Sequence, residues 1–199
     1  MIRSEIDPLR LVALEAGDGV GKTGTLQKLA EAGARVVTTP SPNWTPLRRR
    51  IETAYQRGDI GLGVRFIFYL SGVAAVSSRL KREEGIVFAD RYLLSTLAGH
   101  EAMGMNRDTL LALAPLYRAI LPPSEIVILE CEESERRRRL GERGMSEVDR
   151  RNNELNDRIT HGFGVWADTL GYPITRVDTT HLPIASVAST ISSRYGIHR

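Results

Sequence analysis

Short apolar runs alternate with longer segments of helical periodicity along the chain. Four runs hold apolar residues at consecutive rather than alternate positions, which predicts strands buried on both faces: Leu9–Glu15, Arg35–Thr38, Ile86–Ala89 and Glu125–Glu130. A fifth strand is predicted over Ile174–Asp178. The intervening segments predict helices: Lys22–Ala32, Leu47–Arg57, Gly61–Glu84, Leu93–Met103, Arg107–Ile120, Glu132–Arg143, Asp149–Leu170 and Ile184–Tyr195. The alternation predicts a three-layer α/β/α fold around a five-stranded parallel sheet.

The length of 199 residues fits a single domain over residues 1–199, and no repeat or linker interrupts it. The segment Met1–Pro8 has no apolar signal core, and arginines interrupt the most apolar stretch, Ile60–Leu80. A single cysteine, Cys131, provides no internal disulfide and fits a reducing compartment. We therefore expect a cytoplasmic protein that does not enter a membrane.

A glycine-rich loop follows the first expected strand. Residues 16–23 have the sequence AGDGVGKT, close to the phosphate-binding consensus G-x-x-x-x-G-K-[ST], with Ala16 in place of the first glycine. Lys22 is expected to reach the β- and γ-phosphates of ATP, and the Thr23 hydroxyl to face Mg²⁺. We expect residues 15–24 to bind ATP through Gly17, Asp18, Gly19, Val20, Gly21, Lys22, Thr23 and Gly24.

Two alternatives for this loop are less favoured. One is a glycine-rich turn that binds nothing. The other is a dinucleotide fingerprint, because Gly19, Gly21 and Gly24 match G-x-G-x-x-G. That fold needs an acidic residue at the end of the second strand, where this chain has Thr38 and Thr39. Ala16 is tolerable provided that its backbone angle is not strained.

Asp90 follows an apolar strand, as expected of a carboxylate that helps to hold Mg²⁺ directly or through water. The alternative role for Asp90 is a cap of the next helix. Because a phosphate loop lies earlier in the chain, the metal-binding role of Asp90 is favoured. Arg91, its neighbour, is placed to hold a second phosphate.

These motifs, in order, resemble those of thymidylate kinases and related nucleoside monophosphate kinases, over nearly the whole chain. Residues 15–23, EAGDGVGKT, are similar to E-G-x-D-G-x-G-K-[ST], and residues 90–98, DRYLLSTLA, match D-R-Y-x-x-S-T-x-A. Residues 45–47, TPL, match the end of T-R-E-P-G-G-T-P-L, with Pro42 on the earlier proline. Residues 142–144 and 149–150 match a basic lid, and residues 177–180, VDTT, resemble an adenine-side loop.

The resemblance implies transfer of the ATP γ-phosphate to a nucleoside 5′-monophosphate by a P-loop kinase of the nucleoside monophosphate kinase type. It implies a homodimer through helix Gly61–Glu84. It implies that Asp18 lies near the acceptor sugar or phosphate and that Arg91 holds the acceptor phosphate. It also implies that Ser95 lies near the acceptor base and that Phe68 stacks on it. The acceptor-binding region is expected at residues 39–75, with Pro42, Trp44, Arg48, Phe68 and Ser71 as substrate-binding residues.

The sequence departs from the family pattern around the acceptor. Residues 40–44, PSPNW, replace R-E-P-G-G, and residues 68–72, FYLSG, replace F-A-A-[DN]-R, whose arginine reads the thymine edge in the family. Residues 98–100, AGH, replace A-Y-Q. The acceptor is therefore left open between dTMP and another, modified nucleotide. Trp44 is a candidate to stack on a base.

Arginine makes up 24 of the 27 basic residues. Arg136, Arg139 and Arg143 share a helical face in the expected lid, about residues 136–152, and Gly144 provides flexibility for closure. We expect Arg143 and Arg150 to act with Lys22 and Asp90 in catalysis, and Arg139 and Thr179 to bind ATP. Arg136, Arg137 and Arg138 are expected to be surface residues paired with glutamates.

Two other functions remain open. A nucleoside or other small hydroxyl compound is an alternative acceptor, with Glu15 as the nearest candidate base. A nucleotide-binding regulatory protein with little turnover belongs to another class, although the chain has no N-K-x-D guanine motif. Positive charge is interleaved with 24 acidic residues, which disfavours a nucleic-acid partner.

Overall fold

A computed structural model of the chain describes residues 8–144 and 147–197, with backbone alone for residues 143 and 147–154. Within these residues, five strands form one parallel sheet in the order β2-β3-β1-β4-β5. The strands are β1 (Arg10–Ala16), β2 (Arg35–Thr38), β3 (Ile86–Asp90), β4 (Glu125–Glu130) and β5 (Ile174–Asp178). The expected sheet and its connectivity through helices are confirmed.

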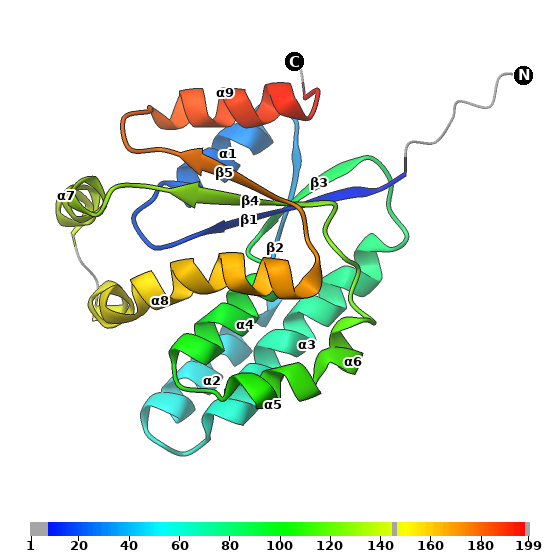
Figure 1. The fold of residues 1–199 in the computed structure, drawn as a ribbon, viewed down its shortest axis with the longest axis vertical. Coiled ribbons are helices and arrows are strands. Elements are labelled where there is room, and N and C mark those ends of the chain that lie inside the picture. The colour runs from blue at the N-terminus through cyan, green and yellow to red at the C-terminus, as the bar shows by residue number, and fades with distance from the viewer. Residues whose placement is uncertain (1–7, 145–146, 198–199) are drawn as a thin grey trace, which may run out of the picture.

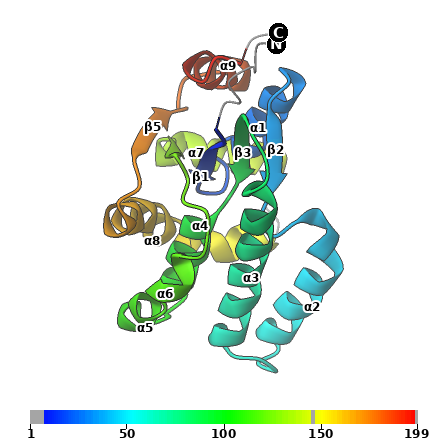
Figure 2. The ribbon, with the colours of Figure 1, turned by 90° about the vertical axis from the view of Figure 1, so that its right-hand side faces the viewer.

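Helices cover both faces of the sheet (Figure 1). One layer holds α1 (Lys22–Glu31) and α9 (Ile184–Arg194), and the other holds α3 (Leu62–Leu80), α4 (Leu93–Ala102) and α8 (Glu147–Leu170). Helix α2 (Thr45–Gln56) packs beside α3, away from the sheet (Figure 2). The three-layer α/β/α fold is thus confirmed.

The two layers bury separate hydrophobic cores because strand side chains alternate between the faces. In β1, Val12 and Leu14 pack with α1 and α9, whereas Leu11 and Ala13 pack with α3, α4 and α8. This explains why β1 is apolar at consecutive positions.

The expected helix over residues 107–120 is wrong as a single helix. It is divided into α5 (Arg107–Ala112) and α6 (Ala114–Tyr117). Pro115 lies in the first turn of α6. Proline has no N–H to donate to Leu111, and its ring clashes with that carbonyl in a continuous helix, so the helix breaks. Elsewhere the boundaries shift little, with α8 beginning at Glu147.

The carboxyl ends of the strands point toward α7 (Glu133–Arg143), as the arrowheads of β4 and β5 show in Figure 1. In open parallel sheets ligands bind beyond these ends. In the described part of the chain, no helix has an apolar stretch long enough to cross a membrane.

Candidate active site

The phosphate loop connects β1 to α1. Its left-handed positions are Gly19, with φ of 87°, and Gly21, with φ of 102°, where glycine avoids the steric penalty of a side chain. Ala16 keeps the strand conformation as the last residue of β1, and its methyl group is buried in the core under α1 and α9. An alanine therefore fits where the consensus has glycine.

Lys22 and Asp90 form an ion pair at the carboxyl edge of the sheet. Lys22 is the first residue of α1 and is 8% exposed, and Asp90 ends β3. Burial lowers the pKa of the Lys22 ammonium, and the charge of Arg91 lowers it further, while Asp90 opposes both. The pair brings the expected phosphate-binding lysine and the expected metal-binding carboxylate together.

Arg91, the residue after Asp90, also contacts the phosphate loop. Its Nη2 donates to Asp18 Oδ1 at 3.2 Å, and its Nη1 donates to Ser95 Oγ at 3.3 Å. Its φ of 62° lies in the left-handed region, which a residue with a side chain rarely adopts. Three of the expected acceptor-side residues are therefore joined in one hydrogen-bonded group.

Glu15 lies beneath this group, 0% exposed. Its Oε1 accepts from Tyr92 N at 2.9 Å and from Ser95 N at 3.3 Å, and its Oε2 accepts from the Ser95 hydroxyl. Burial raises the pKa of the Glu15 carboxyl, while the Ser95 hydrogen bond and the Arg91 charge oppose that shift. Both carboxylate oxygens of Glu15 are thus engaged in hydrogen bonds and shielded from solvent.

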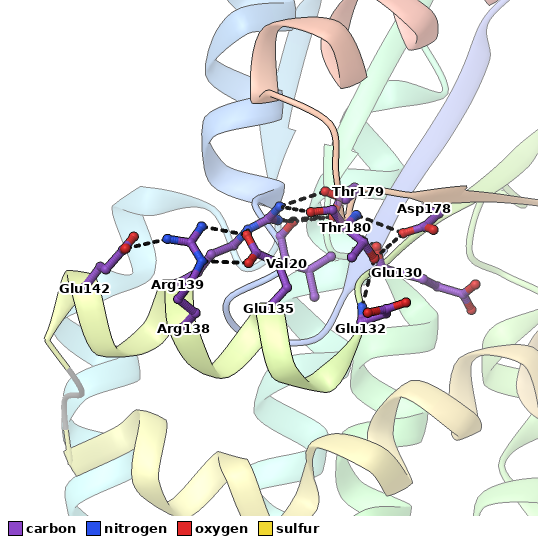
Figure 3. A network of polar contacts seen from close by, with 10 residues as sticks. All are labelled: Val20, Glu130, Glu132, Glu135, Arg138, Arg139, Glu142, Asp178, Thr179 and Thr180. Carbon is purple, nitrogen blue, oxygen red and sulfur yellow. Dashed lines mark hydrogen bonds and ion pairs between the residues drawn. The ribbon is translucent and has the colours of Figure 1, made fainter.

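Arg139 fastens α7 to the phosphate loop and to the β5–α9 loop (Figure 3). Its Nη2 donates to Thr179 O at 2.7 Å and to Thr180 O at 3.0 Å, and its Nη1 donates to Val20 O at 3.3 Å. The Thr179 hydroxyl also donates to Val20 O, at 3.0 Å. Arg139 and Thr179 thus lie together beside the phosphate loop, and their ATP-binding role stays a prediction.

Arg136 and Asn156 hold the same loop at Asp18, a role that the residue pattern did not predict. Arg136 is 3% exposed and donates from Nη1 to Asp18 O at 3.2 Å, whereas Asp18 N donates to Asn156 Oδ1 at 3.2 Å. The expectation of a surface position for Arg136 is wrong, because its helical face, shared with Arg139, packs against the loop. Arg137 and Arg138 are exposed and paired with glutamates, as expected.

The side chains of Arg143 and Arg150 lie outside the described residues. Their expected catalytic roles stay predictions.

Trp44 and Phe68 lie together in the expected acceptor region, with ring centroids 5.8 Å apart and planes tilted by 44°. A small pocket of about 210 Å³ opens beside Trp44. It is lined by Thr38, Pro40, Ser41, Pro42, Trp44, Thr45 and Arg48. Ser71 is exposed, and its spacing from Val64 and Ile67 puts it on the outer face of α3. Its expected contact with substrate stays a prediction.

Gly72 stands where the family pattern has its arginine, and Pro40 closes over it. A Cβ atom built at Gly72 would lie 2.7 Å from Pro40 Cβ, closer than real Cβ contacts come. A side chain at residue 72 would therefore displace the β2–α2 connection. The arginine of the family pattern would therefore need that displacement at this position.

Gly72→Ala is expected to destabilise the fold by about 1–3 kcal/mol, the usual range for overpacking. As its matched control, Gly99→Ala in α4 meets nothing within 4 Å, so it should stabilise the fold by about 0.5–1 kcal/mol through helix propensity. Urea denaturation measures both changes. Equal effects of the two substitutions would contradict the contact between Gly72 and Pro40.

The oxygens expected to hold Mg²⁺ belong to Asp90, whose carboxylate also pairs with Lys22, and to Thr23, which is exposed. Among the described residues, no group of three or more His, Cys, Asp or Glu side chains gathers as in a dedicated metal site. Mg²⁺ in phosphoryl-transfer sites keeps several waters and takes one or two protein oxygens together with substrate phosphates. The donor set therefore fits Mg²⁺ bound with a nucleotide.

A scan of protein-family models and a search of curated proteins find no match to the chain. Solved structures do match. A thymidylate kinase from Candida albicans has a TM-score of 0.76 and 17% identity, covering 98% of this chain and 96% of its own. A deoxyadenosine kinase from M. mycoides, solved with the products dCMP and dCDP, has a TM-score of 0.71 and 15% identity, covering 94% and 98%. The chain therefore has the fold of these nucleotide kinases, and its resemblance to thymidylate kinases extends over nearly its whole length.

Proposed function

We propose that the protein is a nucleoside monophosphate kinase, which transfers the γ-phosphoryl group of ATP to a nucleoside 5′-monophosphate. The observation that supports this most directly is the adjacency of two cation centres. Lys22 contacts Asp90, and the next residue, Arg91, contacts Asp18. A donor phosphate on Lys22 and an acceptor phosphate on Arg91 would lie side by side, as direct transfer requires.

On the donor side, the glycine-rich loop and the N-terminus of α1 present backbone N–H groups to the phosphates. The Lys22 ammonium neutralises negative charge that develops between the β- and γ-phosphates. Asp90 and Thr23 would hold Mg²⁺, which supplies further charge neutralisation when bound. Arg139 and Thr179 would hold the adenosine end.

On the acceptor side, the Arg91 guanidinium is suited to bind a phosphate through two parallel hydrogen bonds. Arg48, which lines the pocket beside Trp44, would add a second cation. Trp44 and Phe68 would supply an apolar surface for the base. With Gly72 in place of the family's arginine, stacking rather than reading of the base edge would dominate, which favours tolerance of several bases.

A nucleoside acceptor is the second candidate, since one structural neighbour is named a deoxyadenosine kinase. That reaction needs a base for the acceptor hydroxyl. Glu15, the candidate that the sequence offered, has both carboxylate oxygens occupied and is fully buried. The geometry therefore favours the monophosphate.

The test is a panel of nucleosides and nucleoside monophosphates, modified ones included, incubated with ATP, Mg²⁺ and the purified protein. A diphosphate product supports the proposal, and a monophosphate formed from a nucleoside supports the second candidate. Tight ATP binding without any product would indicate a regulatory nucleotide-binding protein and would refute both.

We also infer that two copies associate through α3, as the resemblance implies. Val64 and Ile67 are 52% and 49% exposed on one face of this helix. Ile67→Glu is expected to convert a dimer into a monomer because it buries a charge in the apolar contact. Light scattering on a sizing column measures the mass. Leu116→Glu is the matched control, since Leu116 is equally exposed on α6, and it should leave the dimer intact. A wild-type monomer would contradict the inference.

A further inference from the structure

The carboxylate of Glu15 is enclosed although no cation forms an ion pair with it among the described contacts. A buried carboxylate is costly unless hydrogen bonds replace its water. Here every described hydrogen-bond partner of Glu15 belongs to the start of α4: the N–H groups of Tyr92 and Ser95 and the Ser95 hydroxyl. The residue from β1 therefore serves as a cap for a helix that is distant in sequence.

The first turn of a helix has N–H groups without partners inside the helix. Tyr92 occupies the N-cap position of α4, and its own side chain makes no capping hydrogen bond. Glu15 Oε1 accepts from the cap residue itself and from Ser95, three residues later. The negative charge of Glu15 also lies at the positive end of the helix dipole.

The backbone of Arg91, immediately before this cap, is held by hydrogen bonds on both sides of its Cα atom. Its N donates to Leu14 O at 3.2 Å, and its O accepts from the Thr39 hydroxyl at 2.8 Å. The left-handed conformation of an L-residue costs about 1–2 kcal/mol. Such a conformation persists only where surrounding contacts enforce it, and it occurs often at functional sites. Glu15 supplies the next contact along the chain, at Tyr92 N.

We propose that Glu15 is a positioning residue, which caps α4 from β1 and so holds Arg91 in the left-handed conformation that directs its guanidinium toward Asp18. The proposal rests on the proposed function in one respect, namely that Arg91 binds the acceptor phosphate. It assigns Glu15 no contact with substrate. Its effect on the reaction passes entirely through Arg91.

Two conservative variants of Glu15 distinguish the effect of side-chain length from the effect of negative charge. Glu15→Gln keeps the length of the side chain and an oxygen that can accept from Tyr92 and Ser95, but removes the charge. Glu15→Asp keeps the charge but is one methylene shorter, so the carboxylate withdraws from α4. We expect Glu15→Asp to raise the KM of the acceptor about 10-fold and Glu15→Gln to change it less than about 3-fold, with the KM of ATP unchanged in both. The reverse order would overturn the proposal.

A double-mutant cycle with Arg91→Ala tests whether Glu15 acts through Arg91. In the Arg91→Ala background, Glu15→Asp should cause no further rise in acceptor KM. Additive effects would overturn the proposal. Glu101→Asp is the matched control, because Glu101 accepts from Trp166 Nε1 at 2.6 Å away from the phosphate loop. It should lower the melting temperature and leave both KM values unchanged.

A crystal structure of Glu15→Asp without ligands tests, independently of activity, whether Glu15 holds the conformation of Arg91. We expect the φ of Arg91 to leave the left-handed region and its guanidinium to lose Asp18. Retention of both features would overturn the proposal. If the wild-type protein phosphorylates no monophosphate, the proposed function fails, and the conformation of Arg91 in this variant still tests the role of Glu15.

Discussion

Lys22→Met is expected to reduce kcat for phosphoryl transfer by at least about 100-fold, the scale seen when one preorganised donor to a developing charge is removed. Methionine keeps the apolar stem of the buried side chain, so the loss reports the ammonium group. That ammonium lies against Asp90 at the carboxyl edge of the sheet, where the γ-phosphate would pass. Steady-state kinetics with ATP and the best acceptor of the panel measure the change.

Lys28→Met is the matched control on the same helix. Lys28 is exposed and donates to Glu31 at 2.6 Å, so its replacement should change kcat less than about 2-fold and stability by less than about 0.5 kcal/mol. Thermal melting of Lys22→Met establishes that the variant is folded. A folded Lys22→Met protein with wild-type kcat would refute the assignment of the phosphate loop.

The sequence was sufficient for the fold because its signals are local. Runs such as Glu125–Glu130 hold apolar residues at consecutive positions, which is typical of strands covered on both faces. The phosphate loop is equally local, since its glycines and Lys22 lie within one connection. A strand, a glycine-rich turn and a helix start can all be recognised without knowledge of the rest of the molecule.

The contacts that complete the site depend on register and packing, which local patterns do not contain. Leu14 pairs with Asp90 in the sheet, and this pairing brings Glu15 beneath Tyr92 and Ser95. A different register would place another residue there. Likewise, the burial of Arg136 depends on how α7 meets the loop at Asp18. The periodicity of Arg136 with Arg139 was the available signal, but it did not say which face packs inward.

Replacement of Arg91 by alanine is expected to lower kcat/KM for the acceptor by about 100-fold, because a bidentate charged contact to phosphate is lost. The KM of ATP should change less than about 2-fold, since in the proposed function the donor phosphates would contact Lys22 and the loop backbone rather than Arg91. Arg91→Lys should have a kcat/KM for the acceptor between those of the wild-type protein and Arg91→Ala, because lysine keeps the charge but cannot form two parallel hydrogen bonds. Initial rates at varied acceptor concentration distinguish these outcomes.

Arg91→Gly separates the binding role of the side chain from the strain in its backbone. Glycine accepts the φ of 62° without a steric penalty, so this variant should be more stable than Arg91→Ala by about 1 kcal/mol. It lacks the guanidinium and should bind the acceptor as poorly as Arg91→Ala does. If Arg91→Gly is more stable than Arg91→Ala but binds the acceptor more weakly than the wild-type protein, the strained backbone is retained for the position of the guanidinium. If Arg91→Gly kept the wild-type acceptor KM, the phosphate would be held by another cation, and Arg48 would be the first to replace.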